Sequence, residues 1–302
     1  KDVGGTYKTY VNIAPPTGKT PWLQLEINLR ITAGTLGQVD SWGVVRQSVT
    51  VGESLHETDV TGEYITDVHN NDWGILQTQY THGKTYVNAQ KFVGGEYETF
   101  VNLDKPIDQT PWLQREIDRL AIGTPEKLGR VDKWGVIKQN ITIGKSWRED
   151  LLTGEYITES RNNDFGIMVF QETKGASYLF STAYTSGIYD TTADEIDSWG
   201  VIKLSTTDGE SYFVSDRIWD ELPDLIWTNR RGQRVLPISS SYGTTNKFKD
   251  NFGVLKHTST STSTFALVPT GTAPTGSSVS LATWDNAVDI EDTLPDETLT
   301  EI

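Results

Sequence analysis

One stretch of the sequence that has no counterpart elsewhere in the chain concentrates the side chains best suited to binding chemistry. It runs from Arg217 to Arg234 and mixes aromatic rings, carboxylates and guanidinium groups: Trp219, Asp220, Asp224, Trp227, Arg230 and Arg231. Aromatic faces can stack on sugar rings, carboxylates accept hydrogen bonds from hydroxyls, and arginines hold anionic substituents such as phosphate. Because insertions in a repetitive scaffold often carry binding, we predict a glycan site here; a loop that caps the repeats is the alternative.

Catalytic and metal-binding patterns are sparse. The chain has no cysteine, its four histidines are not closely paired, and it contains no GxSxG, HExxH or phosphate-loop motif. Asp220, Glu221 and Asp224 could form the acid pair of a glycoside hydrolase, but carboxylates are abundant in this chain and sequence cannot measure their separation. We therefore predict a protein that is not an enzyme and that has no catalytic residues, cofactor or metal.

Composition limits the fold class and the partners. The 302 residues include 26 Lys and Arg against 41 Asp and Glu, a formal charge of −15, and no run of residues long and apolar enough to span a membrane. Nucleic acid and membrane partners are therefore excluded as first expectations. With 10 Trp, 12 Tyr, 9 Phe and 27 Gly but a single Met, the composition favours an all-β protein rich in turns.

The strongest feature of the sequence is a repeat. Six times an Asp or Asn stands two residues before an aromatic residue, followed by Gly and two apolar residues: DSWGVV from Asp40, NDWGIL from Asn71, DKWGVI from Asp132, NDFGIM from Asn163, DSWGVI from Asp197 and DNFGVL from Asp250. Another large apolar residue always follows the aromatic after thirteen positions. This fixed interval predicts paired strands around a turn of constant length, since a slip of one residue would send every side chain to the opposite face.

The motif residues have two possible roles each. The short Asp or Asn side chain can accept backbone N–H bonds in a turn, and calcium is the alternative at the two NND sequences. The motif aromatics could stack on sugars, but their constant spacing favours buried packing anchors. We therefore predict six structural anchors in the core: Trp42, Trp73, Trp134, Phe165, Trp199 and Phe252.

A second pattern groups the motifs into larger repeats. Each motif is preceded by Gly or Ser, one residue and Tyr, and the distance from this Tyr to the motif is long in the first and third modules and short in the other four, so that long and short modules alternate in the first two units. The predicted organisation is a tandem array of six small β modules in three units of roughly ninety residues: residues 1–93, 94–183 and a divergent 184–268. Residues 269–302 are predicted to form a Ser/Thr/Pro linker and an acidic tail, either flexible or ordered against a neighbouring subunit.

The long loops of the first two units leave local structure open. After Pro21 the sequence alternates like a strand, whereas its counterpart after Pro111 has apolar residues at helical spacing behind Thr-Pro, a combination that suits a helix start. A short helix is therefore one of two expectations for this region. Trp22 and Trp112, at equivalent places in these loops, are candidates for contact with a partner.

The GxY, loop, WGxL and turn pattern, with GEYIT followed by NDWGILQ as its best example, resembles the small β modules of bacteriophage tail-fibre and receptor-binding proteins, including knob-type repeats. The resemblance spans roughly Gly5 to Val268 and departs from those modules in the long loops Asn12–Ser41 and Asn102–Lys133. It implies an extracellular virion protein, a homo-oligomer such as a trimer, that associates with other virion proteins and recognises host cell-surface carbohydrate. A purely structural appendage or capsid-decoration protein and a polysaccharide depolymerase are the alternatives.

Overall fold

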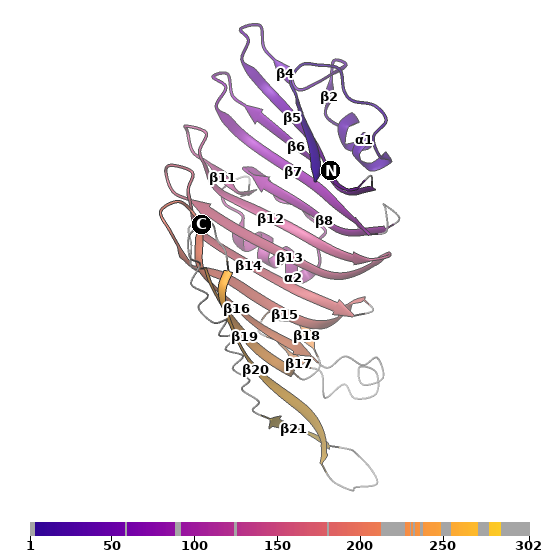
Figure 1. Cartoon of the computed structure of the whole chain (residues 1–302), viewed down its shortest axis with the longest axis vertical. Coiled ribbons are helices and arrows are strands. Elements are labelled where there is room, and N and C mark those ends of the chain that lie inside the picture. Colours follow the sequence, from indigo (N-terminus) through magenta and orange to yellow (C-terminus); the bar gives the residue numbers. More distant parts are fainter. Residues whose placement is uncertain are drawn as a thin grey trace, which may run out of the picture. The chain divides into compact units, whose positions relative to one another are not determined.

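The computed structural model describes residues 4–57, 59–87, 92–123, 126–179, 181–212, 227–229, 231, 233–235, 238–248, 255–270 and 278–284. The chain divides into two compact bodies, Lys1–Tyr184 and Thr185–Ile302, which we call the N-terminal and C-terminal bodies. Both consist mainly of antiparallel strands (Figure 1). The all-β prediction is therefore confirmed.

The N-terminal body is a twisted sheet with the strand order β1-β5-β6-β7-β8-β12-β13-β14. These strands are β1 (Gly5–Tyr10), β5 (Val45–His56), β6 (Asp59–Asn70), β7 (Leu76–Val87), β8 (Phe92–Val101), β12 (Ile137–Arg148), β13 (Leu151–Asn162) and β14 (Met168–Leu179). Two short strands, β4 (Gln38–Val39) and β11 (Arg130–Val131), pair with the beginnings of β5 and β12. Four hairpin turns consequently lie on the same side of the sheet, at the ends of its strands and on the left in Figure 1; we call this side the turn edge.

The two long loops each carry a helix on the same face of this sheet, α1 (Pro21–Asn28) and α2 (Pro111–Leu120). Both start with a threonine cap and a proline in the first turn: Thr20 Oγ1 accepts from the Leu23 amide at 3.2 Å, and Thr110 Oγ1 from the Leu113 amide at 3.4 Å. The helical alternative is thus correct for both loops. The sequence of α1 alternates like a strand, but its capping residues and tertiary packing stabilise the helix instead.

Short two-residue strands complete the loops that carry the helices. β2 (Ile31–Thr32) pairs with β3 (Thr35–Leu36) after α1, and β9 (Leu103–Asp104) pairs with β10 (Lys127–Leu128) around α2.

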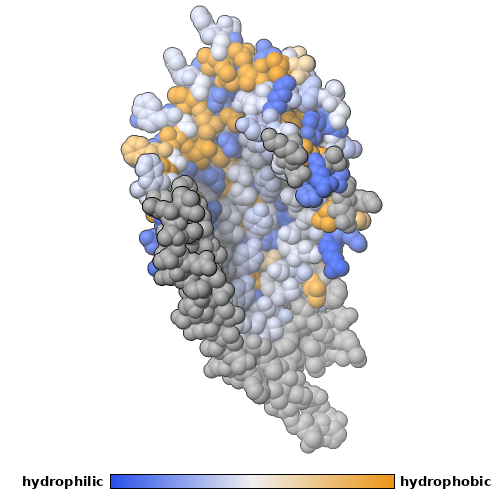
Figure 2. Space-filling view, in the orientation of Figure 1, coloured by the Kyte–Doolittle hydropathy of each residue, from blue (hydrophilic) through white to orange (hydrophobic). Residues whose placement is uncertain are grey.

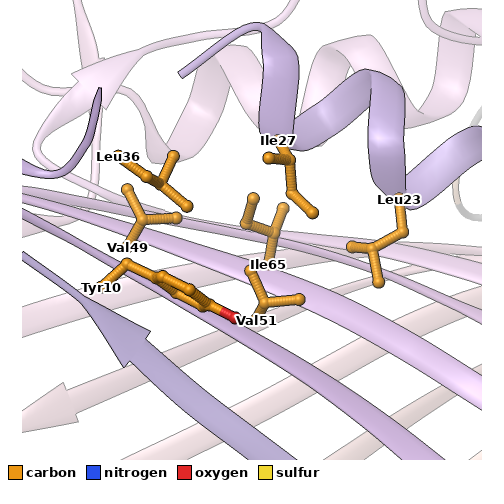
Figure 3. Close-up of a cluster of buried hydrophobic side chains, with 7 residues drawn as sticks. All are labelled: Tyr10, Leu23, Ile27, Leu36, Val49, Val51 and Ile65. Carbon is orange, nitrogen blue, oxygen red and sulfur yellow. The ribbon is translucent and has the colours of Figure 1, made fainter. Parts of the chain in front are cut away.

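Each helix seals an apolar core against the sheet. Under α1, the fully buried Leu23 and Ile27 pack with side chains from β1, β3, β5 and β6, as Figure 3 shows: Tyr10, Leu36, Val49, Val51 and Ile65. Every second residue of β5, including Val49 and Val51, lies on the side of the sheet that the helices cover. We call this side the helix face of the sheet.

A buried carboxylate lies at the start of each helix. Glu63 and Glu155 are both 2% exposed. Glu63 accepts from Thr20 Oγ1 at 2.7 Å and from the Tyr86 hydroxyl; Glu155 accepts from the equivalent Thr110 and Tyr178 hydroxyls. These hydroxyl bonds fix each helix start on the sheet and partly compensate for burial of the carboxylate. Burial nevertheless raises the pKa of Glu155.

The opposite face, which we call the open face, has uncharged rows that run across the strands. One row alternates tyrosine and glycine and consists of Tyr7, Gly52, Tyr64, Gly83, Tyr97, Gly144, Tyr156 and Gly175. The next is all threonine: Thr9, Thr50, Thr66, Thr81, Thr99, Thr142, Thr158 and Thr173. Over the N-terminal body, Figure 2 shows a pale band of near-neutral hydropathy on the face opposite α2.

The two rows are held by direct cross-strand contacts. Threonine hydroxyls pair across strands, as in Thr66 to Thr81 at 2.9 Å and Thr99 to Thr142 at 2.8 Å. The rings of Tyr64, Tyr97 and Tyr156 each lie over a glycine on a neighbouring strand: a Cβ placed on Gly144 would come within 2.1 Å of Tyr156 Cζ. The repeated glycines are therefore required by the tyrosine rings that cover them.

The strands of the C-terminal body also pair antiparallel, in the order β15-β16-β19-β20-β21. These strands are β15 (Ser181–Ile196), which begins just before the division, β16 (Ile202–Tyr212), β19 (Ile238–Phe248), β20 (Leu255–Thr270) and β21 (Ser278–Trp284). A small hairpin joins β17 (Trp227–Thr228) to β18 (Arg234–Val235). Of the predicted linker and acidic tail, β20 and β21 include the described part, and residues 285–302 lie outside the described residues.

Candidate binding surface at the turn edge

The motif forms a closed turn with the same geometry in each described copy. In the first copy, Asp40 Oδ1 accepts from the amides of both Trp42 and Val44 at 2.9 Å, and Gly43 adopts the left-handed φ of 82°. The same pair of side-chain bonds recurs at Asn71, Asp132, Asn163 and Asp197. The predicted structural turn is therefore confirmed in the five described copies, and the sixth lies outside the described residues.

The turn bonds also lower the pKa of two motif carboxylates, those of Asp132 and Asp197. Hydrogen bonds from the Val136 amide and then the Trp134 amide, against the opposing effect of desolvation, lower the pKa of Asp132. The amides of Val201 and Trp199 lower the pKa of Asp197 in the same way. Both carboxylates therefore stay ionised at pH values at which a free aspartate would already bind a proton.

The prediction that the motif aromatics are buried anchors is wrong. Trp42, Trp73, Trp134, Phe165 and Trp199 are between 73% and 90% exposed. The physical reason is their place in the turn: the aromatic residue stands between the Asx residue and the glycine, at the tip of the hairpin, where the backbone turns away from the sheet. That position was a sequence signal for exposure, and the constant spacing reflects the turn itself. Phe252 lies outside the described residues.

Four of these turns form what we call the turn row of the N-terminal body: residues 40–44, 71–75, 132–136 and 163–167. They are in direct contact, since a Cβ on Gly74 would lie 3.5 Å from Val44 Cγ1, one on Gly135 3.0 Å from Ile75 Cγ2, and one on Gly166 3.7 Å from Val136 Cγ1. Neighbouring turns are two strands apart, which gives a period of about 9.6 Å. Four exposed aromatic rings therefore repeat at regular intervals along one edge.

Ion pairs tie the turns together two by two. Arg46 bonds both Asp40, at 3.2 Å, and Asp72 of the next turn. Lys138 bridges Asp132, at 3.7 Å, and Asp164, at 2.5 Å. Each cation thus contacts one carboxylate from its own turn and one from the neighbouring turn, which links the tips in two pairs.

An open hollow of about 540 Å³ lies beside the Trp73 tip. Its lining combines the aromatic ring of Trp73 with hydrogen-bonding groups and two basic side chains: Gln38, Arg46, His69, Asn70, Asn71 and Asp72. The pKa of His69 is raised by its hydrogen bond to Asp67, with burial acting in the opposite direction. An apolar ring face flanked by several donors and acceptors matches the mixed surface of a sugar.

Of the residues predicted to form the glycan site between Arg217 and Arg234, the structure describes Arg231 and the backbone of Trp227. Arg231 is 8% exposed and bonds the Tyr189 carbonyl and Asp190, so its guanidinium serves an internal ion pair, and its assignment to an exposed ligand site is wrong. Trp227 lies in β17, and its side chain is outside the described set. Trp219, Asp220, Asp224 and Arg230, together with the acid-pair candidate Glu221, lie outside the described residues.

The two loop tryptophans are not a pair of exposed contact sites. Trp112 is 2% exposed and belongs to the core under α2. Trp22 is half-buried: its ring makes an edge contact with the His82 ring at 5.0 Å, and Lys84 lies over it at 5.2 Å. The expectation of partner contact is therefore wrong for Trp112, because the amphipathic helix turns this side chain toward the sheet.

Neither a metal centre nor a membrane-spanning helix is found in the described part of the chain. No group of three or more His, Asp and Glu side chains there has an arrangement that could hold a metal ion. No helix there combines the length and the apolar character needed to cross a bilayer.

Comparison of the chain with protein-family models and with curated proteins finds no match.

Proposed function

We propose that this protein is a carbohydrate-binding appendage protein that uses the turn row to hold an extended glycan. One observation carries the proposal: the exposed rings of Trp42, Trp73, Trp134 and Phe165 stand at the tips of four turns that contact one another in series. The period of about 9.6 Å between tips is close to the length of two sugar rings in an extended chain. A linear polysaccharide can therefore meet every tip with the same face.

Charge supports a glycan over a lipid bilayer at these tips. Asp72 and Asp164 stand next to the aromatic rings with side chains 84% and 94% exposed. Inserting the rings into a bilayer interface would bring these carboxylates toward hydrocarbon and anionic headgroups, which is unfavourable. Against a sugar the same carboxylates are useful, because they accept hydrogen bonds from hydroxyl groups.

The wider setting rests on the resemblance of the modules to phage tail-fibre and receptor-binding repeats. On that basis we place the protein outside the cell on a virion surface, as a homo-oligomeric receptor-binding protein whose partners are a host cell-surface glycan and other virion proteins. Regular, rigid tips displayed by several subunits would bind a polymeric receptor with avidity, even when each tip contributes little.

The test compares glycan binding by the full chain with binding by a Trp73→Ala/Trp134→Ala double variant. We expect the parent to bind extended polysaccharides on a glycan array and to adsorb to glycan-bearing bacterial cells, and the double variant to lose at least about tenfold in affinity while it melts with the parent. A Leu29→Ala variant, which removes another exposed apolar side chain away from the tips, is the matched control.

Three results would count against the proposal. Parental binding by a folded double variant would exclude the turn row as the site. Absence of any glycan binding by the parent would instead favour the purely structural appendage. Shortening of a bound polysaccharide on incubation would point to the depolymerase.

A further inference from the structure

The tyrosine–glycine row of the open face has a consistent direction. Each tyrosine ring covers the glycine of the strand that precedes it in the sheet: an added Cβ would meet the ring of Tyr64 at 2.2 Å from Gly52, that of Tyr97 at 2.4 Å from Gly83, and that of Tyr156 at 2.1 Å from Gly144. The C-terminal body repeats the contact between Tyr242 and Gly209. Each tyrosine-bearing strand thus requires a glycine-bearing strand on one particular side.

Tyr7, on β1, is the member of the row that covers no such glycine among the described residues. Its cross-strand neighbour Gly52 is already covered by Tyr64, which reaches Gly52 from the other side. Tyr7 is 77% exposed, whereas Tyr64, Tyr97 and Tyr156 are half-buried. Among the described residues, no strand pairs with the outer edge of β1, so its outward backbone groups are open for pairing.

The internal repeat shows which kind of strand fits this edge. β1 and β8 are equivalent: Gly5, Tyr7 and Thr9 pair with β5 in the same register in which Gly95, Tyr97 and Thr99 pair with β12. On its other edge β8 receives β7, with Thr81 opposite Thr99, Gly83 opposite Tyr97 and Thr85 opposite Gly95. By the same register, the strand that complements β1 reads Thr-x-Gly-x-Ser/Thr.

The charge of Lys8 on β1 further limits which residues the incoming strand can carry. At the position where β8 carries Glu98 opposite His82, β1 carries Lys8, whose ammonium lies 5.0 Å from the Tyr10 ring centre. A basic residue before the glycine of the incoming strand would repel Lys8, while an apolar or acidic residue is compatible. Within this chain the β5 sequence TVGES has the suitable pattern, since Val51 precedes Gly52.

From these observations we infer that the outer edge of β1 is a docking site for an antiparallel β-strand of the type Thr-x-Gly-x-Ser/Thr. Backbone hydrogen bonds provide the general affinity of strand addition. The ring of Tyr7 provides the specificity, because it closes over the incoming glycine and any larger side chain at that position collides with it.

The experiment uses a fluorescently labelled synthetic peptide with the sequence QSVTVGESLH, titrated with the full chain and followed by fluorescence anisotropy. We expect saturable binding. The same peptide with its glycine replaced by valine should bind at least about tenfold more weakly, and so should the parent peptide to a Tyr7→Ala protein. Because Tyr7 is mostly exposed, this variant is expected to stay folded, and its melting temperature checks that.

Two controls locate the site. A Trp42→Ala variant removes another largely exposed aromatic residue, in the turn row, and should leave peptide affinity unchanged. Amide hydrogen exchange should show new protection in Gly5–Tyr10 when the peptide is added. No saturable binding at millimolar concentration, equal binding of the valine peptide, or unchanged affinity of the Tyr7→Ala variant would each overturn the inference.

Discussion

The contact between Tyr156 and Gly144 can be tested by a double-mutant cycle. An alanine at Gly144 would place its Cβ 2.1 Å from Tyr156 Cζ and 2.2 Å from Cε1, so the ring must swing away. The backbone itself accepts alanine, since Gly144 is not among the glycines with positive φ. The cost of Gly144→Ala therefore comes from displacing one ring.

The size of the effect follows from two opposing contributions. Overpacking that displaces a side chain costs about 1–3 kcal/mol. Replacing glycine by alanine where the backbone tolerates it restricts the unfolded chain and stabilises by about 0.4–1 kcal/mol. We expect Gly144→Ala to destabilise the parent by about 1–2 kcal/mol, and to become neutral or slightly stabilising once Tyr156→Ala has removed the ring. The coupling between the two changes is then about 2 kcal/mol.

Urea unfolding of the full chain, followed by circular dichroism, measures the four members of the cycle. Tyr64→Ala is the matched control, because it removes a tyrosine of the same row that covers a different glycine, and its effect should add to that of Gly144→Ala without coupling. If Gly144→Ala costs the same with and without Tyr156, the ring does not impose the glycine, and a strand that pairs opposite Tyr7 would need no glycine either.

Three further predictions concern the turn row and the helix face. Trp134→Ala should change the free energy of unfolding by less than about 0.5 kcal/mol, because the ring is mostly exposed; a loss of several kcal/mol in urea unfolding would contradict this. Asn71→Ala removes the acceptor of two turn amides and should cost about 1 kcal/mol by the same measurement, whereas an unchanged midpoint would show that the backbone bonds suffice. Burial opposes the charged form of His82, but hydrogen bonds to Glu26 and Glu96 outweigh it and raise the pKa of His82 to about 9. Its stabilising charge is therefore complete below about pH 6.5 and is lost as the pH rises through about 9, so the melting temperature of the parent should fall over this interval more than that of His82→Gln, and parallel profiles would refute the assignment.

The repeat made the fold class and the turns predictable. An Asx residue, a glycine and a constant thirteen-residue interval are local requirements of a hairpin, so Asp40 and its equivalents could be assigned to turns without any knowledge of their surroundings. The Thr-Pro sequence and the spacing of apolar residues indicated a possible helix start at α2, with a short helix as one of two expectations. For α1 the sequence left strand and helix open, because the burial of Leu23 and Ile27 against β6 depends on residues far along the chain.

The candidate binding surface was less predictable, since exposure is a property of the folded chain. The motif aromatics looked like core residues by type and regularity, yet their place at the turn tips leaves them in solvent, while Arg231, which looked like a ligand contact, is buried against Asp190. The glycines and tyrosines were visible as separate repeats, but only the strand register brings each ring over its glycine. The sequence by itself determined strands, turns and their period; the tertiary structure decided which face or edge each side chain occupies, because burial depends on pairing between strands that are distant in the chain.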